Sequence, residues 1–248
     1  MTLQRPIKTG EQGYILITAI WLLLLAGSIA ALLVLRSLTT AADAADRQER
    51  VENQLILEAG FETVFADRLV NGISSPWWLL PAEGRVTLDG ASAHVRLTSE
   101  SGRIDINEAE PALIAAALQG LGVSSASRDR FLTRLQSLRA QKQLISSFAH
   151  LRQIEAEAID QSICLEEHFT FTSGLVAPRR DHMSAGLSRA LGYSLSSSQA
   201  PAEAGAALRV QVRSPVGQTL IAVARFSSDQ QNPLAMSSWS TDHQCINR

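Results

Sequence analysis

Residues 14–35 read YILITAIWLLLLAGSIAALLVL and contain no charged side chain. As an α-helix, this stretch is long enough to cross the roughly 30 Å hydrocarbon core of a membrane. Arg5 and Lys8 precede it, and Arg36 alone follows it closely. This charge bias places the N-terminus in the cytoplasm, so we expect a single-pass anchor with the rest of the chain in the periplasm.

A secretory signal peptide is the main competing interpretation of this segment. The apolar part of a signal peptide usually has about 7 to 15 residues and ends at a small-x-small cleavage site. Residues 14–35 are longer, although Ala42-Asp43-Ala44 further along would satisfy such a site. The length therefore favours an anchor helix that stays on the protein.

The residues directly before the apolar stretch are Glu11-Gln12-Gly13, followed at once by Tyr14. This boundary resembles the leader of type IV pilin-like proteins. The resemblance implies that residues 1–13 are a leader, that a prepilin peptidase cuts between Gly13 and Tyr14, and that the new N-terminus is methylated. The alternative is an incidental glycine before an ordinary anchor helix.

Position five of the expected mature chain is Thr18, where most pilin-like subunits have a glutamate that pairs with the N-terminal ammonium of a neighbour. An unpaired charge in the membrane is costly, so a subunit without this glutamate need not pair with one ahead of it. The departure is typical of the K component among type II secretion pseudopilins. The chain thus resembles the minor pseudopilin K family (general secretion pathway protein K), which is thought to cap the pseudopilus tip.

The periodicity after the anchor predicts a helix and then a sheet. Apolar residues at helical spacing continue the helix, so residues 36–70 form its periplasmic part. Alternating residues then predict two or three strands within residues 86–106, with a turn at Asp89-Gly90, and another hairpin within 208–226. We assign residues 71–100 and 205–226 to one antiparallel pilin-like sheet and residues 227–248 to a tail, because the tail shows no period.

Residues 101–204 are expected to form an α-helical domain inserted into this sheet, so the predicted fold class is α+β. Within it, residues 101 to about 160 resemble a helix-hairpin-helix module, which the K family carries as an insertion. We expect Asn107 to accept a backbone N–H at a helix start, and Gly120 and Gly122 to permit a tight reversal.

A membrane-anchored DNA-binding protein is the alternative function, because helix-hairpin-helix modules can bind phosphate. Such a module normally has lysine or arginine beside the glycine-rich turn, and here the basic residues come only on the next helix. The net charge of -2 gives no broad positive field, so nucleic acid is disfavoured. The later basic residues are Arg128, Arg130, Arg134, Arg139 and Lys142.

No catalytic motif or metal-binding spacing stands out, so we expect assembly rather than an enzyme; an anchored exported enzyme or binding protein is the further alternative. Cys164 and Cys245 either form one disulfide in an exported domain or remain two thiols. The family often binds calcium. We find no loop that matches a calcium site. The nearest cluster of oxygen ligands is Asp105, Asn107 and Glu108. No cofactor and no metal ligand is therefore assigned.

The resemblance implies that the partners are other minor pseudopilins, the prepilin peptidase and the inner membrane. It also suggests contact with secreted substrate or with the outer-membrane channel. The expected role is to initiate or cap a periplasmic pseudopilus tip that helps to export folded proteins.

Overall fold

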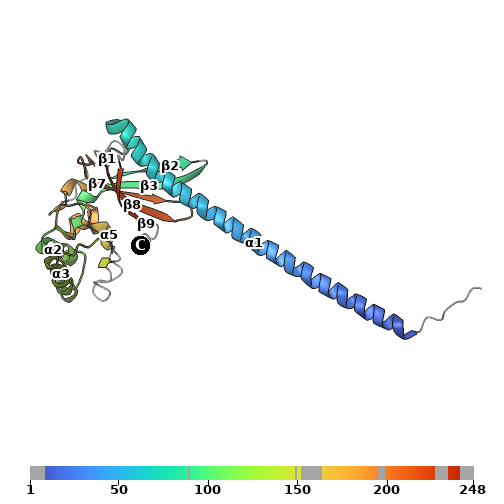
Figure 1. The fold of residues 1–248 in the computed structure, drawn as a ribbon. Helices are drawn as coiled ribbons and strands as arrows, with labels where there is room; N and C mark the ends of the chain where they lie inside the picture. Colours follow the sequence, from blue (N-terminus) through green and yellow to red (C-terminus); the bar gives the residue numbers. More distant parts are fainter. Residues whose placement is uncertain are drawn as a thin grey trace, which may run out of the picture. The chain divides into compact units, whose positions relative to one another are not determined.

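A computed structural model describes residues 9–88, 90–148, 150–151, 164–194, 199–226 and 234–240. The chain forms two compact units, Met1–Glu52 and Asn53–Arg248. Helix α1 (Thr9–Asn71) begins in the first unit and ends in the second (Figure 1).

The first unit is the N-terminal part of α1, and its described apolar side chains are almost all exposed. Leu22, Leu25 and Leu33 are examples. The helix is long and apolar enough to cross a membrane. The predicted long apolar helix is therefore present, and no core formed by the described residues of this unit covers its apolar surface.

The second unit contains a five-stranded antiparallel sheet with the strand order β2-β3-β7-β8-β9 (Figure 1). The predicted combination of a long helix and an antiparallel sheet is confirmed. The strands are β2 (Ala82–Leu88), β3 (Ala91–Ser99), β7 (Ala207–Arg213), β8 (Thr219–Phe226) and β9 (Leu234–Ser240).

One face of this sheet is covered by the last turns of α1. Ile56, Phe61 and Phe65 of the helix share a buried apolar core with residues such as Val95 and Val210 of the sheet. These helical positions recur on one face, as the sequence periodicity predicts.

Gly60 explains how close the helix comes to the sheet. A Cβ atom at this position would lie 2.6 Å from Cγ1 of Val212, so only a glycine permits this approach. The missing side chain thus allows α1 to contact β3 and β7 closely at this point.

The loop after α1 is tied back to the helix by Arg68. Its guanidinium donates to the backbone oxygens of Trp77 and Trp78, with 3.2 Å to the latter, and lies 5.1 Å from the Trp78 ring. Trp77 is buried in the core of the sheet. Trp77 therefore packs in the core, and the Trp78 ring packs against the Arg68 guanidinium.

The chain between β3 and β7 builds a second apolar core that shares no residue with the first. Ile114, Leu118, Phe131, Leu135 and Phe169 belong to this core. Its main helices are α2 (Pro111–Gly120), α3 (Ser125–Ala140), α5 (Leu165–His168) and α6 (Ala185–Ala190). Its short elements are η2 (Glu100–Gly102), β4 (Ile104–Asp105), β5 (Phe169–Thr170) and η3 (Arg180–His182).

Outside this second core, η1 (Gly72–Ser74) follows α1, and β1 (Leu79–Leu80) pairs with β6 (Ala200–Pro201).

Two details of the predicted sheet are wrong. The third alternating run, Ile104 to Ile106, is not a strand of the main sheet: β4 pairs in parallel with β5 instead, inside the helical region. The segment assigned to a tail contains strand β9, which pairs with β8. Its sequence, LAMSSWS, is mostly exposed and shows no clean alternation because it is an edge strand with a register shift opposite Val223/Ala224. The expected turn includes Asp89, which lies outside the described residues.

Candidate functional site

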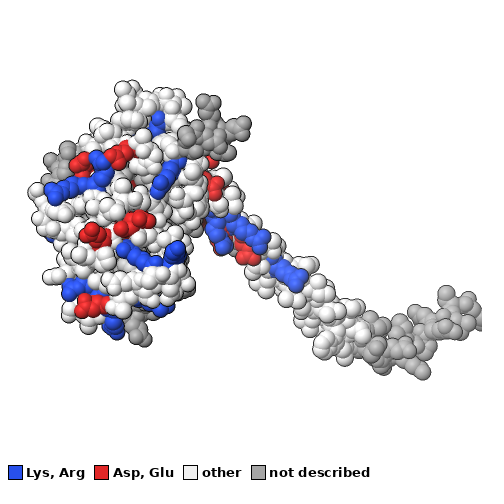
Figure 2. All heavy atoms as spheres, turned by 60° about the vertical axis from the view of Figure 1, so that its left-hand side comes forward, with Lys and Arg blue, Asp and Glu red and all other residues white. Residues whose placement is uncertain are grey.

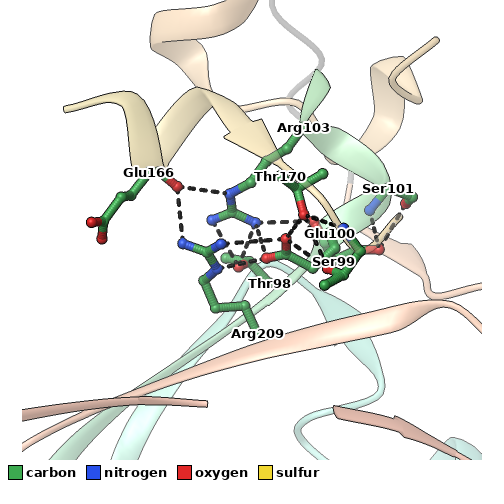
Figure 3. A network of polar contacts seen from close by, with 9 residues as sticks. Thr98, Ser99, Glu100, Ser101, Arg103, Glu166, Thr170 and Arg209 are labelled. Atoms are coloured by element: carbon green, nitrogen blue, oxygen red, sulfur yellow. Dashed lines mark hydrogen bonds and ion pairs between the residues drawn. The ribbon is translucent and has the colours of Figure 1, made fainter. Parts of the chain in front are cut away.

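The most highly organised polar cluster surrounds Glu100, at the point where the chain leaves β3 (Figure 3). Its side chain is completely buried, at 0% exposure. One carboxylate oxygen, Oε1, accepts from Arg209 Nε at 2.6 Å and from Arg103 Nη1 at 3.0 Å. The other, Oε2, accepts from Arg209 Nη2 at 3.3 Å and from the Thr170 hydroxyl. Two arginines thus share one buried carboxylate.

The backbone oxygen of Glu166 binds the same two guanidinium groups from the opposite side. Arg209 Nη1 donates to it at 2.9 Å and Arg103 Nε at 3.3 Å. The Glu166 carboxylate itself is directed away from the two arginines (Figure 3). The cluster therefore connects three parts of the chain: strand β7, the segment directly after β3, and α5. The contacts between them are polar and charged rather than apolar.

The charges in the cluster influence one another. Burial raises the pKa of the Glu100 carboxyl, but the positive charges of Arg209 and Arg103 more than offset this, so the net pKa is lowered. Burial and the charge of Arg209 lower the pKa of Arg103 to about 10. The ionised form of the Glu100 carboxyl is therefore stabilised, whereas the two guanidinium groups are buried close to each other and repel.

The sequence prediction missed this cluster, although a signal was available. In β7, Leu208, Val210 and Val212 alternate with Arg209 and Gln211. Alternation places the polar residues on the sheet face opposite α1. An arginine in the middle of such a strand needs a counter-ion, but Glu100 lies far away in the sequence and sits in no recognisable motif.

Asn107 does not cap a helix as expected. The N-cap of α2 is Glu110, followed by Pro111 at the first helical position. The Asn107 side chain instead pairs with the backbone of Ile145: its Nδ2 donates to the Ile145 oxygen at 2.8 Å, and its Oδ1 accepts from the Ile145 nitrogen at 2.9 Å. It therefore joins the start of the helical hairpin to the segment after α3.

Gly122 has a φ of +86° and turns the chain out of α2, as the expected hairpin requires. Gly120 acts differently: a Cβ atom there would lie 2.0 Å from the backbone oxygen of Ala190. It is needed for the close approach of α2 to α6. A Leu-Gly pair ends both helices with the same hydrogen bonds, since Val123 donates to Leu118 at 2.9 Å and Tyr193 to Ser188 at 2.8 Å.

A solved structure has this architecture over most of the chain. It is a chain of the GspK-GspI-GspJ complex from the enterotoxigenic Escherichia coli type 2 secretion system, matched with a TM-score of 0.56 at 9% sequence identity. The match covers 81% of the present chain and 99% of the other. The chain has a GspK-like fold. No protein-family model and no curated protein sequence matches it.

The residues of the expected leader boundary belong to the first unit. Gly13 and Tyr14 have helical backbone within α1, and residues 1–8 of the expected leader lie outside the described residues. Thr18 is half-buried in the same helix. The GspK-like fold is thus accompanied by an apolar N-terminal helix, while peptidase cleavage and the role of position five stay predictions.

Two of the basic residues after the hairpin, Arg128 and Arg139, make contacts within the protein. Arg139 turns inward: its Nη2 donates to the backbone oxygens of Ile106 at 2.5 Å and Ala109 at 2.8 Å, and burial lowers its pKa. Arg128 donates to Gln119 at 3.2 Å. On the face of the second unit seen in Figure 2, acidic and basic side chains are interspersed. The helical hairpin of the GspK-like fold is thus built for packing.

The remaining predicted site residues concern calcium and the cysteines. The Asp105 carboxylate accepts from the backbone nitrogens of Asn107 at 2.9 Å and Gly174 at 2.8 Å, and from the Ser173 hydroxyl at 3.1 Å, so it organises the chain around it. Within the described residues, no three His, Cys, Asp or Glu side chains gather in a way that could hold a metal. Cys164 is disulfide-bonded. Cys245 lies outside the described residues, and its pairing stays a prediction.

Proposed function

We propose that this chain is a minor pseudopilin of a type II protein secretion system and that it initiates or caps the tip of the periplasmic pseudopilus. In this role it helps to export folded proteins through assembly, without a catalytic step of its own. The observation that carries the proposal is the GspK-like fold, which accounts for 99% of the matched chain from a secretion complex.

The N-terminal helix supports a role in a membrane-anchored assembly. Its described apolar side chains are exposed over more than enough length to cross a bilayer. We propose that it anchors the chain in the inner membrane in a single pass, with the N-terminus in the cytoplasm and the second unit in the periplasm. Before assembly, the prepilin peptidase removes the leader.

Thr18 supports the tip position in particular. A glutamate there would place a charge inside the expected membrane segment, where it would need a cation from a neighbouring subunit. Threonine makes no such demand. We propose that no subunit follows this one at the tip of the pseudopilus. Other minor pseudopilins bind its N-terminal helix from the membrane side of the fibre. The helical region contacts secreted substrate or the outer-membrane channel.

The leader boundary provides the direct test. We expect Gly13→Val to block cleavage, so that the protein extracted from membranes keeps Met1 and its full mass. Gly10→Val is the matched control, because Gly10 belongs to the same segment but is not adjacent to the apolar run that begins at Tyr14. Intact mass and N-terminal sequencing of both variants and of the unchanged chain would measure cleavage and methylation together.

An unchanged chain that retains Met1 would contradict the pseudopilin assignment and would favour an ordinary anchor helix. Equal cleavage of the Gly13→Val and Gly10→Val variants would contradict the expected cleavage site. A secretion assay in a strain that depends on this chain completes the test: Gly13→Val should abolish export of the secreted proteins, and Gly10→Val should not.

A further inference from the structure

In the buried cluster around Glu100, two guanidinium groups are hydrogen-bonded to one carboxylate, and the next negative charge that acts on Arg103 is the exposed Glu167. Arg103 and Arg209 are both nearly enclosed, with side-chain exposures of 13% and 9%, and they share a single carboxylate. Burying a cation without a counter-ion is unfavourable, so such a cluster would be stabilised by a second anion. Burial and then the charge of Arg209 lower the pKa of Arg103.

The two guanidinium groups also have donors left over. Within the described residues, Arg209 Nη1 and Nη2 each make one hydrogen bond, although each carries two N–H groups. Arg103 Nη2 contacts only the Thr98 hydroxyl, at 3.4 Å. The remaining donors are therefore available for a planar acceptor with two oxygens.

A cavity of about 330 Å³ opens beside these donors. Arg103 and Arg209 line it, and two further arginines, Arg96 and Arg213, extend from neighbouring strands into its wall. Two glutamates also line it, Glu166 buried and Glu167 exposed, and Arg96 is paired with Glu83 at 3.0 Å. Four arginines and two glutamates thus contribute to the lining, and the cavity has room for more than a water molecule.

We propose that this cavity binds a carboxylate, held by the guanidinium groups of Arg103 and Arg209 and steered by Arg213. The arginine fork fits two carboxylate oxygens. Inorganic phosphate is the competing anion that the test must separate from a carboxylate. The carboxylate comes either from an acidic side chain of a polypeptide or from a small free acid. This site stands independently of the proposed function.

The test uses the full chain in detergent and isothermal titration calorimetry at constant ionic strength. The first probe is the capped tripeptide Ac-Ala-Glu-Ala-NH2, with Ac-Ala-Gln-Ala-NH2 as its uncharged match. Succinate represents a small free acid, and inorganic phosphate tests the competing anion. We expect binding of the glutamate peptide or of succinate with a Kd below about 10 mM, and none of the glutamine peptide.

Two substitutions distinguish this cavity from general basicity. Arg213→Gln removes an exposed wall residue and should weaken carboxylate binding about two- to fivefold, as expected for one partly screened charge. Arg85→Gln is its control, because Arg85 lies on the same sheet in register with His94 and Arg213 but does not line the cavity. Arg103→Lys keeps the charge but loses the fork, so it should weaken binding at least tenfold where its melting curve shows a folded protein.

Each outcome has a defined meaning. Tighter binding of the glutamate peptide supports the site with a polypeptide as its ligand, and tighter binding of succinate supports it with a free acid. The proposal is overturned if neither carboxylate binds, if phosphate binds and the carboxylates do not, or if Arg85→Gln weakens binding as much as Arg213→Gln.

Discussion

Glu100→Gln is the substitution that most directly tests the charged cluster. It leaves a side chain of the same size at a completely buried position but removes the only carboxylate shared by Arg103 and Arg209. Removing one partner of a buried ion pair costs roughly 3–5 kcal/mol, because the remaining charge stays buried without compensation. For a unit of this size, each kcal/mol lowers the melting temperature by about 2–4 °C. We therefore expect a decrease of roughly 6–20 °C.

Thermal unfolding of the full chain in detergent, followed by circular dichroism, would measure this decrease. The matched control is Glu83→Gln, which breaks the ion pair with Arg96 at 3.0 Å, whose side chains are 55% and 48% exposed. An exposed pair of this kind contributes about 0–1 kcal/mol, so the control should melt within a few degrees of the unchanged protein. Equal decreases in the two variants would refute the reasoning.

The same pair of variants gives a pH dependence with a definite sign. Burial raises the Glu100 pKa, but the charges of Arg209 and Arg103 lower it by more, so the folded-state pKa is below the ordinary value of 4.5. The ionised group therefore stabilises the fold above pH 4.5, and this contribution is lost as the pH falls from 4.5 through the folded-state pKa. The stability difference between the unchanged chain and Glu100→Gln should shrink over that acidic range, and a constant difference would contradict the assignment.

Three further substitutions test the helical region. Gly120→Ala should destabilise it by about 1–3 kcal/mol, because the added Cβ would meet the Ala190 oxygen at 2.0 Å. Asn107→Ala should cost about 1–3 kcal/mol, since it leaves the Ile145 backbone groups without their partner. Burial lowers the pKa of His168 below 6.5, so protonation favours unfolding and stability is lost as the pH falls below 6.5; His168→Gln should flatten this loss.

Controls for these variants come from positions without the proposed contacts. Gly27→Ala, where a Cβ would meet nothing within 4 Å, should leave the melting temperature unchanged. Asn71→Ala removes only an exposed hydrogen bond to Asp67. His94→Gln changes an exposed histidine of the sheet. A proposed contact is contradicted if the control variant lowers the free energy of unfolding as much as the test variant does. For His168, the contradiction is an equal change in the loss of stability below pH 6.5 in the His94→Gln control.

The sequence predicted those parts of the fold that depend on local patterns. The anchor helix follows from an uncharged apolar run, and its continuation to Asn71 follows from apolar residues at helical spacing. Strands β2, β3 and β7 follow from alternation, because α1 buries one face of each, whereas β8 follows from an apolar run after a turn and is buried on both faces. Strand β9 was not predicted, because an exposed edge strand needs no alternation of apolar and polar residues.

The polar contacts could not be predicted in the same way. Asn107 has the right residue type for a helix cap, but its partner, Ile145, is 38 positions away. Glu100 and Arg209 are 109 positions apart. A local pattern can show that a residue is polar and that a strand face is polar. It cannot show which distant group will satisfy the charge, because that depends on how the chain returns to the sheet.

This return explains why the cluster is placed where it is. The chain leaves the sheet after β3 at Glu100 and Arg103 and comes back into it at Arg209 in β7. The apolar core beneath α1 and the apolar core of the helical region share no residue, and the charged cluster joins the elements that carry them. Loss of the Glu100 carboxylate weakens this contact and leaves both apolar cores intact, although Arg209 and Arg225 still donate to the Glu166 and Thr172 backbone oxygens. Glu100→Gln should therefore broaden calorimetric unfolding or divide it into two transitions, whereas Gly120→Ala, whose defect lies inside one core, should lower the stability of the helical region alone.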